Sequence, residues 1–201
     1  MKSSNNVVFG FIMLVISLPT ISLSQAISED VQIKNALLSG PEDLRADATV
    51  YGFDSEGNMV TLRAGTNELI CITDDPNQNA FNSACYHKAL EPFMVRGREL
   101  RAEGMGRKDI FDTRENEVQA GTLNMPDTPT TLHIYSGPQK IIDEETGLAE
   151  GGNYRAVIYI PYATAASTGL ALTPEVNGGP WLMDPGTHRA HIMITPPKNE
   201  N

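Results

Sequence analysis

The chain has 201 residues, of which 25 are acidic and 15 are basic, so its formal net charge at pH 7 is −10. This acidic balance argues against nucleic acid and against an anionic membrane surface as partners, because both attract basic proteins. The length is typical of one domain with a core of its own.

Residues 1–26 are predicted to be a cleaved secretory signal peptide. Lys2 gives a positive start, residues 7–15 form an apolar run, and Ser24-Gln25-Ala26 places small residues at a cleavage site. The run is shorter than the roughly 20 apolar residues of a membrane-spanning helix, and a retained anchor is the alternative. Removal of Lys2 with this segment leaves 25 acidic and 14 basic residues, a net charge of −11. An exported protein, periplasmic or extracellular, is expected, without a membrane partner after cleavage.

The first half of the mature chain predicts one helix and three strands. Residues 28–38 combine a loose helical spacing of apolar residues with a serine and acidic residues at the front. Residues 48–53 and 59–63 flank a glycine-containing turn and predict a hairpin, and residues 68–73 predict a third strand. An antiparallel meander is the simplest assembly of the three strands.

The second half predicts a helix and three further strands. The helix begins at Glu91-Pro92, because proline is tolerated in a first turn, and ends at Gly104. Residues 108–129 are polar and contain two prolines, which predicts a long surface connection. The β-branched and aromatic runs predict strands at 131–135, 154–160 and 190–195.

These elements predict an α+β fold with a mainly antiparallel sheet of five to six strands and one or two packed helices. Residues 27–197 are expected to form a single globular domain, followed by a polar tail at 198–201.

The only two cysteines, Cys71 and Cys85, enclose the run CITDDPNQNAFNSAC. Two cysteines in an exported chain predict a disulfide, and closing a loop of this size is worth roughly 3 kcal/mol. The bond is expected to fasten a polar loop to the sheet edge. Two free thiols are the alternative, and a catalytic thiol is disfavoured because no CxxC spacing is present.

The same run resembles a calcium loop in part. Asp75, Asn77 and Asn79 occupy the first three ligand positions of an EF-hand, but Ala80 replaces the turn glycine and Tyr86 replaces the bidentate glutamate. An EF-hand is therefore excluded. A weak irregular calcium site over residues 74–79 stays open.

The four histidines offer no assembled metal motif, and neither a metal nor another cofactor is expected. His188 and His191 would share a face only on a helix, whereas their surroundings predict a strand. A zinc site of His87, His188 and His191 is the alternative if the fold brings them together. Motifs for a nucleophile elbow, a P-loop or a dinucleotide are absent from the sequence.

Three patches together resemble an uncharacterised family of exported bacterial proteins. They are Leu62–Asn67 followed by Cys71 and an Asp-Asp-Pro, then Cys85, and finally Trp181 with the strand His191–Ile194. The chain departs from the family pattern at Leu69, where the family has an aromatic residue, and after Cys85, where Tyr-His replaces an apolar-acidic pair. The resemblance implies export and a shared architecture and leaves the function open. It singles out Asn67, Trp181 and His191 as a candidate ligand pocket.

Three functions are compatible with these features. The first is a non-catalytic exported domain that binds a small ligand or a partner, which the lack of a catalytic motif favours. The second is a hydrolase that uses His191 with a carboxylate or a bound metal. The third is a structural component of the cell envelope.

Overall fold

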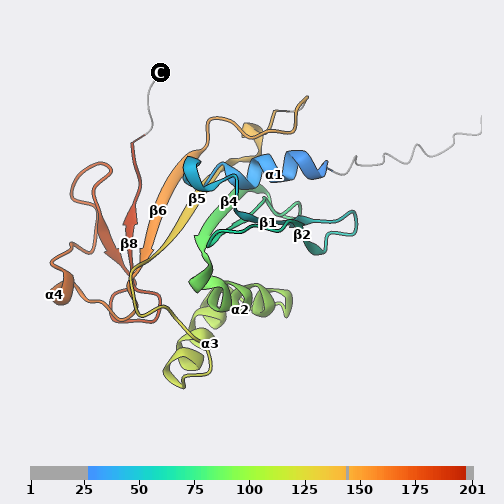
Figure 1. Ribbon diagram of the computed structural model, residues 1–201. Helices are drawn as coiled ribbons and strands as arrows, with labels where there is room; N and C mark the ends of the chain where they lie inside the picture. Colours follow the sequence, from blue (N-terminus) through green and yellow to red (C-terminus); the bar gives the residue numbers. More distant parts are fainter. Residues whose placement is uncertain (1–26, 144, 198–201) are drawn as a thin grey trace, which may run out of the picture.

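A computed structural model of the chain describes residues 27–143 and 145–197, so the predicted signal peptide and C-terminal tail lie outside the described residues. The fold is α+β, as expected (Figure 1). The helices are α1 (Glu29–Leu37), α2 (Glu91–Ala102), α3 (Arg107–Gln119) and α4 (Ala165–Thr168), with 3₁₀ turns at Glu42–Leu44, Lys88–Leu90 and Gln139–Ile141. The strands are β1 (Thr49–Phe53), β2 (Met59–Arg63), β3 (Leu69–Ile72), β4 (Ala80–His87), β5 (Thr130–Pro138), β6 (Asn153–Tyr159), β7 (Trp181–Met183) and β8 (His191–Ile194).

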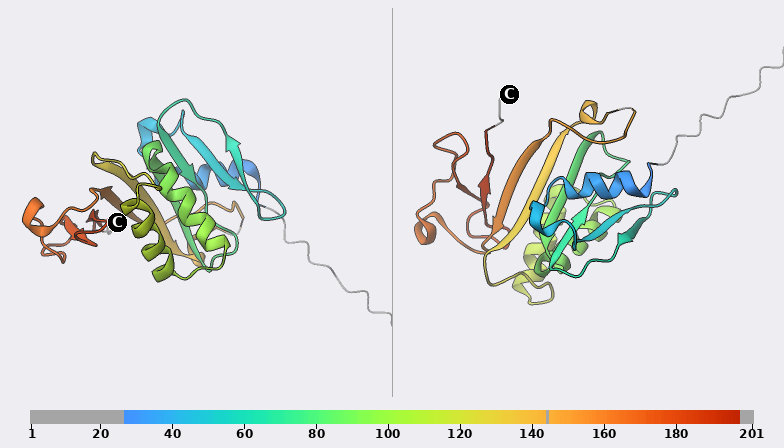
Figure 2. Two further views of the ribbon diagram at one scale, coloured as in Figure 1. Left: turned by 90° about the horizontal axis from the view of Figure 1, so that it is seen from below. Right: turned by 45° about the horizontal axis from the view of Figure 1, so that its top comes forward.

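All eight strands of the described residues join one sheet in the order β2-β1-β3-β4-β5-β6-β8-β7. The predicted five to six strands and one or two helices are therefore too few. The sheet is mainly antiparallel, as predicted, except that β1 and β3 are parallel. Helix α1 packs on β1, β3 and β4 on one face, while α2 and α3 lie together on the opposite face (Figure 2).

Local chemistry explains the elements that the sequence predicted. Ser28 caps α1 by accepting a hydrogen bond from the Val31 amide, and two acidic residues stand in the first turn. Helix α2 begins at Glu91-Pro92 as expected, and Gly104 follows its end with a φ of 85°. The β1–β2 hairpin closes through the Asp54 carboxylate, which accepts from two backbone amides of its own turn.

The expected meander is wrong at its third strand, because β3 pairs with β1 rather than with β2. The connection from β2 to β3 passes over the start of β1, and hydrogen bonds from the Arg63–Asn67 segment fix this connection. Arg63 donates to the Ala48 carbonyl at 3.0 Å, and Asn67 donates to the Leu44 carbonyl at 2.8 Å. A Cβ on Gly65 would lie 2.2 Å from the Thr49 nitrogen, so only glycine fits this crossing.

Two segments expected as loops are regular elements. Residues 80–87 form β4, a central strand that pairs with both β3 and β5. Residues 107–119 form α3. Arg114 lies on the buried face of this helix and interrupts the apolar pattern of that face. The sheet also contains the unpredicted short strand β7 at its edge.

Each face of the sheet has its own core. The larger core lies under α2 and α3 and includes Tyr86, Phe93 and Tyr159, and the smaller one lies under α1 around the two cysteines. No helix among the described residues has the length and apolarity needed to cross a bilayer.

Candidate functional site

The most distinctive region lies where α3 meets the chain that follows β6 and the chain that precedes β8. Backbone hydrogen bonds extend the β6–β8 pairing beyond both strands: Tyr162 donates to the Thr187 carbonyl at 2.7 Å, and Gly186 donates to the Ala163 carbonyl at 2.8 Å. These bonds hold the 184–190 connection beside residues 160–163.

Two non-glycine residues in this region have left-handed backbones, Tyr162 with a φ of 62° and Asp184 with a φ of 48°. Aspartate tolerates this conformation, but a bulky tyrosine adopts it at a cost of order 1–3 kcal/mol. Backbone strain of this kind is common at functional sites, and it persists only where the surrounding structure fixes the strained residue. The outlier at Tyr162 therefore marks this region for attention.

A partly buried Glu115 and a fully buried His188 form a pair that joins α3 to the 184–190 connection. One oxygen of the Glu115 carboxylate accepts from the His188 backbone amide at 2.8 Å and lies 2.6 Å from the ring Nδ1. With Nδ1 donating, Nε2 carries no proton, and it is buried without a hydrogen-bond partner. The His188 ring is fully enclosed and lies against Phe93 and Phe111, with ring centroids 5.5 Å and 4.9 Å away.

The pKa values follow from this burial. Desolvation lowers the pKa of His188 and outweighs the opposite influence of Glu115, so the ring is neutral at pH 7. Burial also tends to raise the pKa of Glu115, but the hydrogen bonds from His188 outweigh it and the pKa is lowered. The pair is thus a carboxylate that bonds a neutral imidazole.

Arg114 lies between α2 and α3 in the same region. Its guanidinium carbon is 3.9 Å from the Phe93 ring centroid, and its Nη1 donates to the Phe93 carbonyl at 3.2 Å. A Cβ on Gly97 would come within 2.8 Å of Nη1, so glycine at that position makes room for the side chain. Burial lowers the pKa of Arg114 to about 10, and the group stays charged at pH 7.

A groove of about 560 Å³ opens beside these groups. Its walls come from the end of α3, the 121–129 segment and the chain just after β6, and include Val118, Leu123, Met125, Ile160 and Tyr162. Tyr162 is 43% exposed, and partial burial together with the neighbouring Glu115 raises the pKa of its phenol. The groove and the Glu115–His188 pair therefore meet at Tyr162.

The three residues expected to form a pocket are not brought together. Asn67 lies at the start of β3, where its side chain also accepts from the Leu69 amide, four strands away from β8. Trp181 and His191 do share the α2–α3 face on adjacent strands, because Trp181 pairs with Met193 and His191 with Met183. His191 is buried, and its Nδ1 is 2.7 Å from the Arg189 carbonyl oxygen.

The residues of the alternative zinc site make separate contacts. His87 begins the 3₁₀ turn after β4 and accepts from the Ala89 amide, while His188 bonds Glu115 and His191 bonds a backbone carbonyl. Within residues 27–143 and 145–197, no three histidine, cysteine or acidic side chains gather in a way that suits a metal ion. In the calcium-like run, Asp74 and Asp75 accept from the backbone amides of Asn82 and Asn77.

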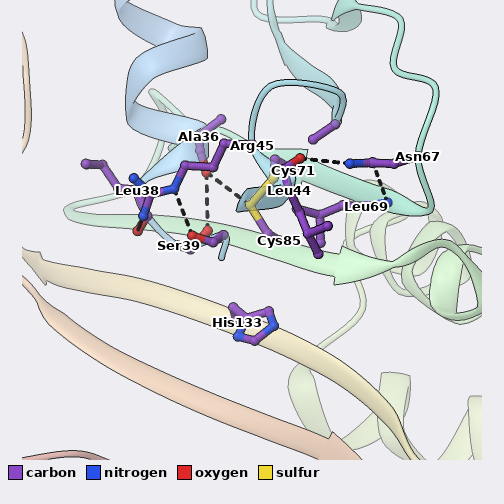
Figure 3. Close-up of a disulfide and its surroundings, with 12 residues drawn as sticks. Ala36, Leu38, Ser39, Leu44, Arg45, Asn67, Leu69, Cys71, Cys85 and His133 are labelled. Carbon is purple, nitrogen blue, oxygen red and sulfur yellow. Dashed lines mark hydrogen bonds between the residues drawn. A yellow bond between two sulfur atoms is a disulfide. The ribbon is translucent and has the colours of Figure 1, made fainter. Parts of the chain in front are cut away.

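The predicted disulfide between Cys71 and Cys85 is present (Figure 3). The two cysteines are directly opposite each other on β3 and β4, so the bond joins paired strands rather than fastening a loop to the sheet edge. It is fully buried under α1, where Cys85 contacts the Ala36 carbonyl and Gly40 approaches both sulfurs.

The sequence does not single out Arg114 or Glu115, because the polarity of residues 108–129 predicts a loop there. Nothing in the sequence around Tyr162 indicates its strained backbone. A helical stripe of Ile110, Arg114 and Val118 is detectable only if an arginine is allowed on the buried face. Comparison with models of known protein families, with curated proteins and with solved structures gives no match. The resemblance to exported bacterial proteins therefore stays an expectation from short motifs.

Proposed function

We propose that the protein is an exported, non-catalytic binding domain that holds a small ligand in the groove between α3 and the segments 121–129 and 160–163. The observation that carries the proposal is the exposed Tyr162, kept in a strained backbone at the wall of this groove. Export is supported by the leader-like residues 1–26 and by the buried disulfide, which is typical of oxidising compartments.

The groove walls indicate the kind of ligand. A volume of about 560 Å³ lies within the roughly 300–1,000 Å³ of small-molecule sites. Most wall residues are apolar or proline, and the polar ones are concentrated in the 124–128 segment. A compact molecule with an apolar body, stacked on the Tyr162 ring, fits this pattern.

The test is a ligand-observed NMR screen of small aromatic and aliphatic fragments, followed by calorimetry on the hits. We expect Tyr162→Ala to weaken the hits at least tenfold, because it removes the exposed ring of the groove. Leu172→Ala is the matched control, since Leu172 is 51% exposed and does not line the groove. Hits that bind Tyr162→Ala as tightly as the wild type, or a fragment that the protein turns over, contradict the proposal.

A hydrolase is the second candidate. Glu115 orients a neutral His188, as in a general base, but Nε2 is fully buried, so a substrate would reach it only after the surrounding side chains moved. His191, the histidine favoured from the sequence, bonds a backbone carbonyl instead of a carboxylate. Turnover of chromogenic esters that is lost in His188→Asn would establish the hydrolase and displace the binding proposal.

A further inference from the structure

Arg114 lacks the anionic partner that buried charges ordinarily have. Arg114 is only 9% exposed, yet its side chain makes no ion pair with any described residue. Its Nε is buried without a hydrogen-bond partner. A buried charge without a counter-charge is costly, so folds ordinarily retain one only for a purpose.

Arg96 on the neighbouring helix α2 shows what the same group does with a carboxylate. The Nε of Arg96 donates to the two Glu117 oxygens at 2.9 Å and 3.0 Å, and its Nη2 donates to one of them at 2.7 Å. This edge of the guanidinium matches the geometry of a planar oxyanion. On Arg114 the same edge is free, because neither Nε nor Nη2 bonds a described residue.

The carboxylates of this region already have partners. Glu117 is held by Arg96, Glu115 by His188, and Asp184 by Arg189 at 2.7 Å. The positive charges of Arg189 and Arg101 add to that of Arg114, and after burial they are the next groups that lower its pKa. The surroundings therefore favour an anion from outside the described chain.

Tyr159 supplies a second polar group. It is buried on the same face of the sheet, where its ring packs edge-on against the Phe93 ring that Arg114 contacts, with the two ring centroids 5.7 Å apart. Its hydroxyl makes no hydrogen bond with a described residue. A phenol that donates to one oxygen of an anion would complement the two donors of the guanidinium edge.

We propose that the Nε–Nη2 edge of Arg114, together with the Tyr159 hydroxyl, binds an oxyanion, either a carboxylate or a phosphate. The site is next to the groove along both elements, since Val118 follows Arg114 by one helical turn and Ile160 follows Tyr159. The oxyanion site is separate from the proposed ligand groove and does not depend on it, because a free anion can occupy the site when the groove is empty.

The experiment titrates sodium acetate and, separately, sodium phosphate into the mature chain, with sodium chloride at matched ionic strength as the reference. The ¹⁵N NMR resonances of the arginine Nε–H groups report binding, and loss of one resonance in Arg114→Met assigns Arg114. We expect the Arg114 resonance to shift and saturate with acetate or phosphate but not with chloride. Saturation by acetate alone identifies a carboxylate ligand, and saturation by phosphate alone identifies a phosphate.

Two variants and a control make the result specific. Arg114→Met, and Arg114→Lys, which keeps the charge but has no two-donor edge, should each weaken anion binding at least tenfold. Arg107→Met removes one positive charge from an exposed position of α3 and should bind like the wild type. If Arg114→Met does not fold, the anion affinity of Arg114→Lys tests the proposal. Shifts no larger than those with chloride, or equal weakening by Arg107→Met, overturn the proposal.

Discussion

His188 illustrates how a single residue links burial to charge. Its ring is fully enclosed between two phenylalanines, and among the described residues its only hydrogen-bond partner is Glu115. The charges of Arg114 and Arg189 disfavour a third positive charge nearby. Desolvation likewise lowers the pKa of His133 and His191. Three of the four histidines are therefore held neutral by the fold.

This burial predicts that acidification destabilises the protein. Below the ordinary histidine pKa of about 6.5, the unfolded chain binds protons that the folded chain does not bind. The free energy of unfolding therefore decreases as the pH decreases. The slope is at most about 1.4 kcal/mol per pH unit for each histidine. Asp74, whose pKa burial raises to about 6, takes up a proton in the folded chain around that pH and works in the opposite direction. The wild type and His188→Asn share this contribution, so the difference between them from pH 7.5 to 6 isolates His188.

Urea unfolding at pH steps across this window measures the slope. The amide of His188→Asn can replace the Nδ1 donor without titrating. This variant should lower the slope of the free energy of unfolding against pH by up to about 1.4 kcal/mol per pH unit, the equivalent of one proton. A slope between pH 7.5 and 6 that is unchanged in His188→Asn contradicts the assignment of His188.

At the scale of elements, the β3–β4 pair lies inside the sheet and depends on two features of the sequence. The Arg63–Asn67 segment carries the chain over the start of β1, which makes β3 parallel to β1. The Cys71–Cys85 bond then ties β3 to β4 under α1. The motif that resembles exported proteins thus has a structural role in this fold.

Replacing both cysteines by alanine should lower the free energy of unfolding by about 3 kcal/mol, because the bond closes a loop of this length in the unfolded chain. Urea unfolding of the double variant measures the loss. The wild type with a reductant is the matched comparison and should unfold at the same urea concentration as the double variant. A loss below about 1 kcal/mol would contradict a stabilising role for the bond.

The whole molecule is a sheet between two unequal helical layers. Its disulfide is consistent with an exported protein. Intact mass spectrometry of protein from the exported fraction of its host should give a chain that starts at Ile27 and lacks two hydrogens. Iodoacetamide should not label it before reduction. An intact N-terminus or two reactive thiols would be incompatible with export and oxidation.

Features set by neighbouring residues were determined by the sequence alone. The cap of α1, the proline start of α2, the β1–β2 turn and the cysteine pair each depend on contacts within a short stretch or on the cysteine count. The α+β class followed from these periodic segments. The size of the sheet did not, because β4 has serine and cysteine at inward positions and α3 has an arginine, so their apolar patterns are weak.

Only the tertiary structure decided which distant residues meet. Glu115 and His188 are 73 positions apart, and Tyr162 reaches the same region from a third segment. The polarity of Glu115 and Arg114 indicates a loop in the sequence, because the residues that they contact, His188 and Phe93, come from other segments of the chain. Contacts of this kind depend on the packing of whole elements, and no local pattern in the sequence encodes them.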